Sequence, residues 1–152
     1  MPAQKIIPCL WFDGQAEAAA AFYVSVFPDS AVTKVTPGPT GAALVVEFRL
    51  AGMRFLALNG GPQFTFNEAV SLSIDCRSQA EVDELWEKLS AGGAPGQCGW
   101  CTDKWGLSWQ ITPIALTEAV TGPDTAAAKR AFDAMMQMKK IDIAAIEAAR
   151  RG

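Results

Sequence analysis

The chain has 152 residues, of which 50% are hydrophobic and 19% are charged, and its formal net charge is −3. This length and composition fit one globular domain, or two small repeated halves that share a core. The acidic balance argues against nucleic-acid binding, which needs a basic surface, and no apolar run approaches the ~20 residues that span a membrane. The N-terminus lacks the features of a signal peptide, so we expect a cytoplasmic protein.

The first part of the chain predicts the order strand, helix and three strands. An apolar, β-prone stretch at residues 5–12 predicts the first strand. The alanine-rich residues 15–27 predict a helix whose apolar face consists of Ala18, Ala21, Phe22, Val26 and Phe27. Three further strands are expected at residues 31–36, 43–50 and 54–58, after which the sequence Asn59-Gly60-Gly61-Pro62 breaks the pattern.

The same order then restarts. Residues 70–76 predict a strand, and Ser78 with Glu81 fits a capping box at the start of a helix. Strands are expected at residues 96–101 and 107–112, with a turn at 104–106 and Asp103 and Gly106 as turn residues. The chain therefore predicts a first βαβββ module at residues 1–61 and a second at 62–114.

A helical extension is predicted at residues 115–152. Helices are expected at residues 115–120, 124–140 and 143–151. Their apolar stripe should pack on the protein's own sheet or on a partner subunit.

Several segments resemble one protein family. They are PCLWFDGQAEAAAAFY at 8–23, ALNGGPQFTFNEAVSLSI at 57–74, CGWCTDKWGLSWQITP at 98–113 and MMQMKKIDI at 135–143. With the twofold βαβββ order, they resemble the PhnB-like branch of the vicinal oxygen chelate superfamily, which includes glyoxalase I, bleomycin-resistance proteins and extradiol dioxygenases. This branch is often labelled as a 3-demethylubiquinone-9 3-methyltransferase domain. The resemblance implies an α+β fold in which two modules form a curled mixed sheet around a cavity, in a homodimer.

The resemblance also implies where metal ligands would stand. The matching positions are Ile7, Ala57 or Asn59, Ser71 and Gln110. An isoleucine cannot ligate, and the remaining side chains are neutral, whereas divalent ions prefer carboxylates, histidine or cysteine. The chain contains no histidine. We therefore expect no metal and no cofactor, with a weakly held divalent ion at Gln110 and Glu68 as the alternative.

Candidate ligand-binding residues gather near the expected cavity. Polar candidates are Asn59, Asn67, Ser71, Ser73 and Gln110, and aromatic ones are Trp11, Phe66, Trp100 and Trp109. Ligand pockets are mostly apolar with a few placed polar groups, although any single aromatic residue belongs by default to the core. Glu68 stands beside Phe64 and Phe66, where a raised pKa would suit a catalytic base. The alternative interpretation is that Glu68 is an acidic loop residue whose carboxylate accepts hydrogen bonds from backbone amides of a turn.

Four cysteines, Cys9, Cys76, Cys98 and Cys101, are expected to be reduced thiols. Cys98 and Cys101 form a single C-x-x-C in an expected strand. Incidental thiols are favoured over a zinc or redox site, because no second ligand pair accompanies them.

Three hypotheses for the function follow. The first is a small-molecule binding protein that sequesters or senses a partly aromatic ligand. The second is an enzyme that abstracts a proton from a small substrate through Glu68. Methyl transfer is disfavoured, because no glycine-rich strand-to-helix turn for S-adenosylmethionine is present. The third is an interaction protein that docks through its C-terminal helices.

Overall fold

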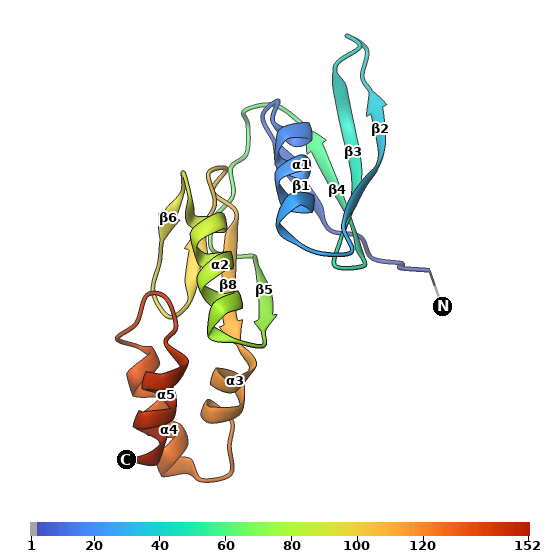
Figure 1. Ribbon diagram of the computed structural model, residues 1–152. Coiled ribbons are helices and arrows are strands. Elements are labelled where there is room, and N and C mark those ends of the chain that lie inside the picture. Colours follow the sequence, from blue (N-terminus) through green and yellow to red (C-terminus); the bar gives the residue numbers. More distant parts are fainter. Residues whose placement is uncertain (1–2) are drawn as a thin grey trace. The chain divides into compact units, whose positions relative to one another are not determined.

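The computed structural model describes residues 3–152, which fall into two compact units with their boundary between Phe66 and Asn67 (Figure 1). The first unit consists of β1 (Cys9–Phe12), α1 (Ala16–Val26), β2 (Ala31–Pro37), β3 (Ala43–Leu50) and β4 (Met53–Asn59). Its strands lie in the order β1-β4-β3-β2. β1 is parallel to β4, and the other neighbours are antiparallel.

The second unit repeats this order and adds helices. It consists of β5 (Ser71–Cys76), α2 (Gln79–Ser90), β6 (Ala94–Pro95), β7 (Trp100–Thr102), β8 (Ser108–Pro113), α3 (Ile114–Val120), α4 (Thr125–Met135) and α5 (Ile143–Arg151). Its sheet has the order β5-β8-β7-β6, with β5 parallel to β8. The equivalent strand orders confirm the predicted repeat of βαβββ modules. No helix within residues 3–152 is long and apolar enough to cross a membrane.

Helix α1 packs on the first sheet through a different face from the one predicted. The buried residues are Ala16, Ala19, Ala20 and Tyr23, whereas Ala18 and Ala21 are exposed. The helix is so rich in alanine that polar residues do not mark its outer face. The predicted apolar face was centred on the bulky Phe22, which is only partly buried. The small buried alanines instead bring the helix close to the sheet, where Tyr23 packs near Phe48.

Three boundaries also differ from the prediction. The first strand begins at Cys9 rather than at residue 5, and the expected strand at 96–101 is a turn followed by β7. Cys98 and Gly99 both have positive φ angles, of 58° and 84°, which a strand does not accommodate. The predicted helix at 124–140 ends at Met135, because residues 136–138 form short-range bonds that turn the chain away.

Helix α2 begins at the predicted cap. Ser78 Oγ accepts a hydrogen bond from Glu81 N, as a capping box requires. The Glu81 carboxylate returns to Arg77 N rather than to the backbone of Ser78. The apolar face of the helix, Val82, Leu85 and Leu89, is buried.

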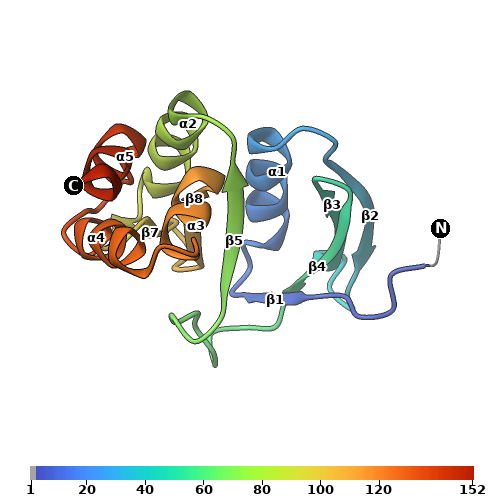
Figure 2. The same ribbon diagram turned by 90° about the horizontal axis from the view of Figure 1, so that it is seen from below.

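The C-terminal helices form a small core of their own within the second unit. Leu116, Ala119, Ala131, Ile141 and Ile146 are its buried members. Figure 2 shows α4 and α5 side by side, with α3 next to α4. The apolar stripe was expected to pack on the protein's own sheet or on a partner subunit, whereas the three helices pack mainly on one another.

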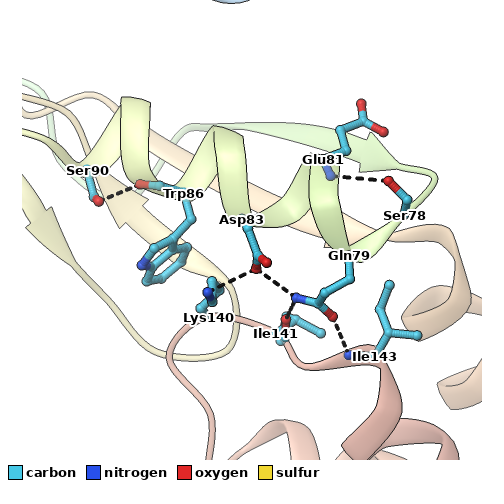
Figure 3. A network of polar contacts seen from close by, with 9 residues as sticks. All are labelled: Ser78, Gln79, Glu81, Asp83, Trp86, Ser90, Lys140, Ile141 and Ile143. Atoms are coloured by element: carbon cyan, nitrogen blue, oxygen red, sulfur yellow. Dashed lines mark hydrogen bonds and ion pairs between the residues drawn. The ribbon is translucent and has the colours of Figure 1, made fainter.

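A polar latch attaches the extension to α2 (Figure 3). Gln79 Nε2 donates to Ile141 O at 3.0 Å, while Gln79 Oε1 accepts from Ile143 N at 2.8 Å. One helix turn further on, Asp83 Oδ1 lies 2.9 Å from Lys140 Nζ. We call this set, Gln79, Asp83, Lys140, Ile141 and Ile143, the latch.

Candidate functional site: the open face of the second sheet

The register of the second sheet sorts its side chains onto two faces. Ser71 pairs with Ser108, Ser73 with Gln110, and Trp100 with Gln110. Paired residues in neighbouring strands place their side chains on the same face of a sheet. Ser71, Ser73, Trp100, Thr102, Ser108 and Gln110 therefore share one face, which we call the open face.

The opposite face of this sheet forms the hydrophobic core with α2. Leu72, Cys101 and Trp109 lie there, in register with one another. Trp109 is 2% exposed, and its indole Nε1 donates to Asp103 Oδ2 at 2.9 Å. The structure therefore separates Trp109 from Gln110, although they are adjacent in the sequence and were predicted to line one cavity.

On the open face, Gln110 is joined to Ser71. Gln110 Nε2 donates to Ser71 Oγ at 2.9 Å. A serine hydroxyl that accepts a bond still has a proton to donate, and the amide oxygen of glutamine is an acceptor. The pair thus offers a molecule that binds over this face both donors and acceptors of hydrogen bonds, none of them charged.

A groove of about 450 Å³ lies beside this pair. Its lining includes Trp100, Thr102 and Ser108 of the open face, and its other members are Glu68, Ala94, Pro95, Gly96, Gln97, Cys98 and Cys101. Sites for small ligands have volumes of roughly 300–1,000 Å³ and a mainly apolar lining with a few polar groups. The groove has the size and the composition of such a site.

Ser108 is the unusual polar residue of this lining. Its side chain is 0% exposed, and its Oγ has no hydrogen-bond partner among the described residues. A buried hydroxyl without a partner costs about 1–3 kcal/mol. Sequence reasoning missed Ser108, although its position two residues before Gln110 places it on the same face by strand alternation.

The segment before β5 contains three predicted site residues. The Phe66 ring packs edge-on against Phe12, with the centroids 5.3 Å apart. Asn67 Oδ1 accepts a bond from Ala69 N, which closes a local turn. Glu68 is exposed and lines the groove. Of the three, Glu68 alone is brought to the open face of the second sheet.

Two further candidates belong to the first unit. Asn59 Oδ1 accepts a bond from Ala16 N at 2.9 Å, and its Nδ2 donates to Ala43 O at 3.0 Å. It therefore caps α1, which has no capping side chain at Gln15. Trp11 Nε1 donates to Gly61 O, and its indole contacts Phe64 edge-on. Both side chains are held by their own unit.

The thiols of the second unit differ in environment. Burial raises the pKa of the Cys101 thiol to about 11, with a further contribution from the Asp103 carboxylate. Cys98 is half-buried, and its Sγ donates to Met136 Sδ at 3.7 Å. Thiolates are the metal ligands and nucleophiles of cysteine chemistry. The raised pKa makes the Cys101 thiol a weaker nucleophile and a poorer metal ligand at neutral pH than an ordinary cysteine.

The metal positions implied by the superfamily do not fit an ion. Ile7 is apolar, Asn59 is engaged with two backbone groups, and Ser71 is bonded to Gln110. No group of three or more His, Cys, Asp or Glu side chains within residues 3–152 is arranged to hold a metal. Glu68 lines the groove, whereas the Gln110 side chain is bonded to Ser71.

The twofold βαβββ fold is that of the vicinal oxygen chelate superfamily. Residues 4–112 match the family model of 3-demethylubiquinone-9 3-methyltransferase, and the chain belongs to this family. Residues 113–152, which include the resembling segment at 135–143, lie outside the match.

Solved structures support this assignment. The PhnB protein from Bacillus cereus is 32% identical, with a TM-score of 0.68 over 72% of this chain and 99% of that one. Protein PA1353 from Pseudomonas aeruginosa is 18% identical, with a TM-score of 0.60 over 73% and 98% of the two chains. The fosfomycin resistance protein FosX from Listeria monocytogenes is 15% identical, with a TM-score of 0.51 over 72% and 89%. The last two show the fold alone. Among curated proteins, none matches this chain.

Proposed function

We propose that this protein binds a small, partly aromatic molecule on the open face of its second sheet, in the groove beside Ser108. The observation that carries the proposal is the buried Ser108 hydroxyl, which has no partner among the described residues and lines the groove. A ligand with a polar atom at this point satisfies the hydroxyl and gains a hydrogen bond of about 0.5–1.5 kcal/mol.

Trp100 is the reason for expecting an aromatic group in the ligand, because its indole can pack against such a group in the groove. It is half-buried, it lies on the same face as Ser108, and it lines the same groove. Aromatic rings that stack or meet edge-on gain about 0.5–1.5 kcal/mol beyond the area they bury. The neutral pair Ser71 and Gln110 on this face favours an uncharged polar group, such as an amide or an alcohol.

The experiment is a titration of the whole protein with benzamide, benzyl alcohol and phenol, followed by nuclear magnetic resonance of the backbone amides. We expect shifts at Ser71, Trp100 and Ser108, with weaker binding in Ser108→Ala and Trp100→Leu. Ser25→Ala is the matched control, because the Ser25 hydroxyl is bonded to Phe22 O in the first unit. Shifts spread evenly over both units, or equal affinity in all variants, would contradict the proposal.

A second candidate function is catalysis of proton abstraction by Glu68. The observation that favours it is the position of this carboxylate in the wall of the groove that contains Ser108. A general base needs to come within about 2.6–3.2 Å of the proton it removes. If any ligand of the groove is turned over, Glu68→Gln should abolish turnover and leave binding intact, and unchanged turnover would exclude this role.

We do not propose methyl transfer. A common site for S-adenosylmethionine uses glycines in a turn that leads from a strand into a helix. Gly60 and Gly61 follow β4 without a helix, and a side chain on Gly60 would overlap the Trp11 indole. Gly60 instead makes room for the tryptophan.

The proposed state of assembly is a homodimer in the cytoplasm. Its support is the family resemblance, together with the half-buried Trp11, Val45 and Leu58 on the face of the first sheet away from α1. Light scattering coupled to gel filtration should give twice the chain mass, and a monomer at micromolar concentration would contradict the expectation.

A further inference from the structure

One wall of the groove is a strained turn at residues 97–99. Cys98 has a φ of 58°, and Gly99 follows it with a φ of 84°. A left-handed conformation at a residue with a side chain costs energy and persists only where its surroundings impose it. The turn's own bond from Trp100 N to Gln97 O closes it but leaves the amides of Cys98 and Gly99 unused.

The C-terminal extension supplies the missing partners. Cys98 N donates to Met138 O at 2.8 Å, and Gly99 N donates to Lys139 O at 2.7 Å. These two carbonyls are available because α4 ends at Met135 and the chain turns before α5 begins. The Cys98 thiol also contacts Met136. Contacts from residues 136–139 therefore hold the turn from one side, while Gly99 O accepts a bond from Ile111 N of β8 at 2.8 Å.

Packing reinforces these hydrogen bonds. Gly99 is buried, and a Cβ placed on it would lie 3.0 Å from Ile141 Cγ1 and 3.0 Å from Ile111 O. Ile141 is itself 0% exposed. The extension thus fits against a backbone position where there is no space for a side chain, which fixes how far the turn can move.

The latch holds the extension in this position. Gln79 bonds both the carbonyl of Ile141 and the amide of Ile143, and Asp83 pairs with Lys140. The bonds from Gln79 and Lys140 lower the pKa of Asp83 below its usual range. The latch residues of the extension, Lys140, Ile141 and Ile143, follow closely after Met138 and Lys139, the two residues that bond the turn.

We propose that the C-terminal extension determines which ligands the groove accepts, because it holds the turn at residues 97–99 as a rigid wall. The extension lies beyond residues 4–112, which match the family model, so ligand selection in this protein would depend on a segment outside that match. This inference depends on the proposed function, since it concerns the same groove.

The test weakens the latch without removing the extension. Lys140→Ala breaks the pair with Asp83, and Gln79→Met removes both backbone bonds at similar side-chain volume. Lys88→Ala is the matched control, because it removes an ion pair with Glu84 on the same helix that does not reach the extension. The exposed fractions of Lys88 and Lys140 are similar, at 45% and 43%.

The first measurement is hydrogen exchange of the Cys98 and Gly99 amides in the whole protein. We expect exchange to accelerate about tenfold or more in Gln79→Met, less in Lys140→Ala, and not at all in Lys88→Ala. The amides of β5 and β8 should stay protected in every variant, which shows that the unit remains folded. Unchanged exchange at Cys98 and Gly99 in Gln79→Met would overturn the inference.

The second measurement compares benzamide with 2-naphthamide, which share an amide group and differ in ring size. A released turn should change the ratio of their two dissociation constants several-fold in favour of the larger ring. An unchanged ratio despite faster exchange would overturn the inference and leave the proposed function intact. Failure of the native protein to bind either amide would overturn both.

Discussion

Gln110 Nε2 donates a hydrogen bond to Ser71 Oγ across the parallel pair of β5 and β8, at 2.9 Å. Gln110 is in register with Ser73, so its side chain reaches diagonally to the residue that precedes Ser73 on the same face. The superfamily resemblance places metal ligands at these two positions. In this protein they bind each other.

This bond predicts a measurable coupling. A double-mutant cycle of Ser71→Ala and Gln110→Leu should give a coupling free energy of about 0.5–1.5 kcal/mol, the usual worth of a neutral hydrogen bond. Urea unfolding of the four proteins measures it. Ser73→Ala is the control, since Ser73 lies on the same strand and face but is exposed. A coupling as large with Ser73 as with Ser71 would contradict the prediction.

Asp103 organises the turn between β7 and β8. Its Oδ1 accepts bonds from Trp105 N and Leu107 N, and its Oδ2 accepts the indole proton of Trp109. In Asp103→Asn one carboxylate oxygen becomes an NH₂ group that faces a donor, so we expect a loss of about 2–4 kcal/mol of unfolding free energy.

Asp133→Asn is the comparison for this variant. Asp133 is exposed and pairs with Lys129 on the same helix, and such pairs contribute about 0.3–0.5 kcal/mol. Both proteins are compared by urea unfolding. Equal losses in the two variants would show that the buried carboxylate does not stabilise the turn.

Two buried thiols predict a loss of stability at alkaline pH. Burial raises the pKa of Cys76 from 9.0 to about 12, with smaller contributions from Glu81 and Asp75, and it raises that of Cys101 to about 11. Above pH 9 the unfolded chain releases these protons and the folded chain retains them. The stability is therefore fully present below pH 9 and falls by about 1.4 kcal/mol per pH unit for each thiol until its folded pKa is reached.

The measurement is urea unfolding at pH 8, 9 and 10 on the native protein and on Cys76→Ala. The variant should be less stable at pH 8 because of the small cavity, but its stability should fall less steeply with pH. Ser25→Ala serves as the control because it removes an exposed hydroxyl and no thiol. Identical slopes in the native protein and Cys76→Ala would contradict the assignment.

Gly60 leaves the space that Trp11 occupies. A Cβ on Gly60 would lie 2.4 Å from Trp11 Cζ2, far inside normal contact distance. Gly60→Ala should displace the indole, break its bond to Gly61 O and cost about 1–3 kcal/mol. Gly38→Ala is matched to it, since its Cβ would meet Leu44 Cβ at 3.4 Å, an ordinary contact. A tryptophan emission spectrum unchanged in Gly60→Ala would contradict the prediction.

Local sequence patterns determined the elements of this fold. Apolar alternation placed β3 and β5 within a residue of their observed bounds, and the side chains of Ser78 and Glu81 marked the start of α2. Asp103 and Gly106 were correctly assigned to a turn, because a short acidic side chain that binds its own backbone is a local signal. The repeated order of these elements was enough to indicate the superfamily.

Only the tertiary structure decided which side chains meet. Ser71 and Gln110 are 39 positions apart, and their contact depends on the register of two parallel strands. Asn59 caps a helix 43 positions earlier, a role that its neighbours in the sequence do not indicate. Likewise, the turn at Cys98 is held by carbonyls 40 positions later. Periodicity records whether a residue lies on a buried or an exposed face, whereas partners distant in the sequence are fixed by register and packing.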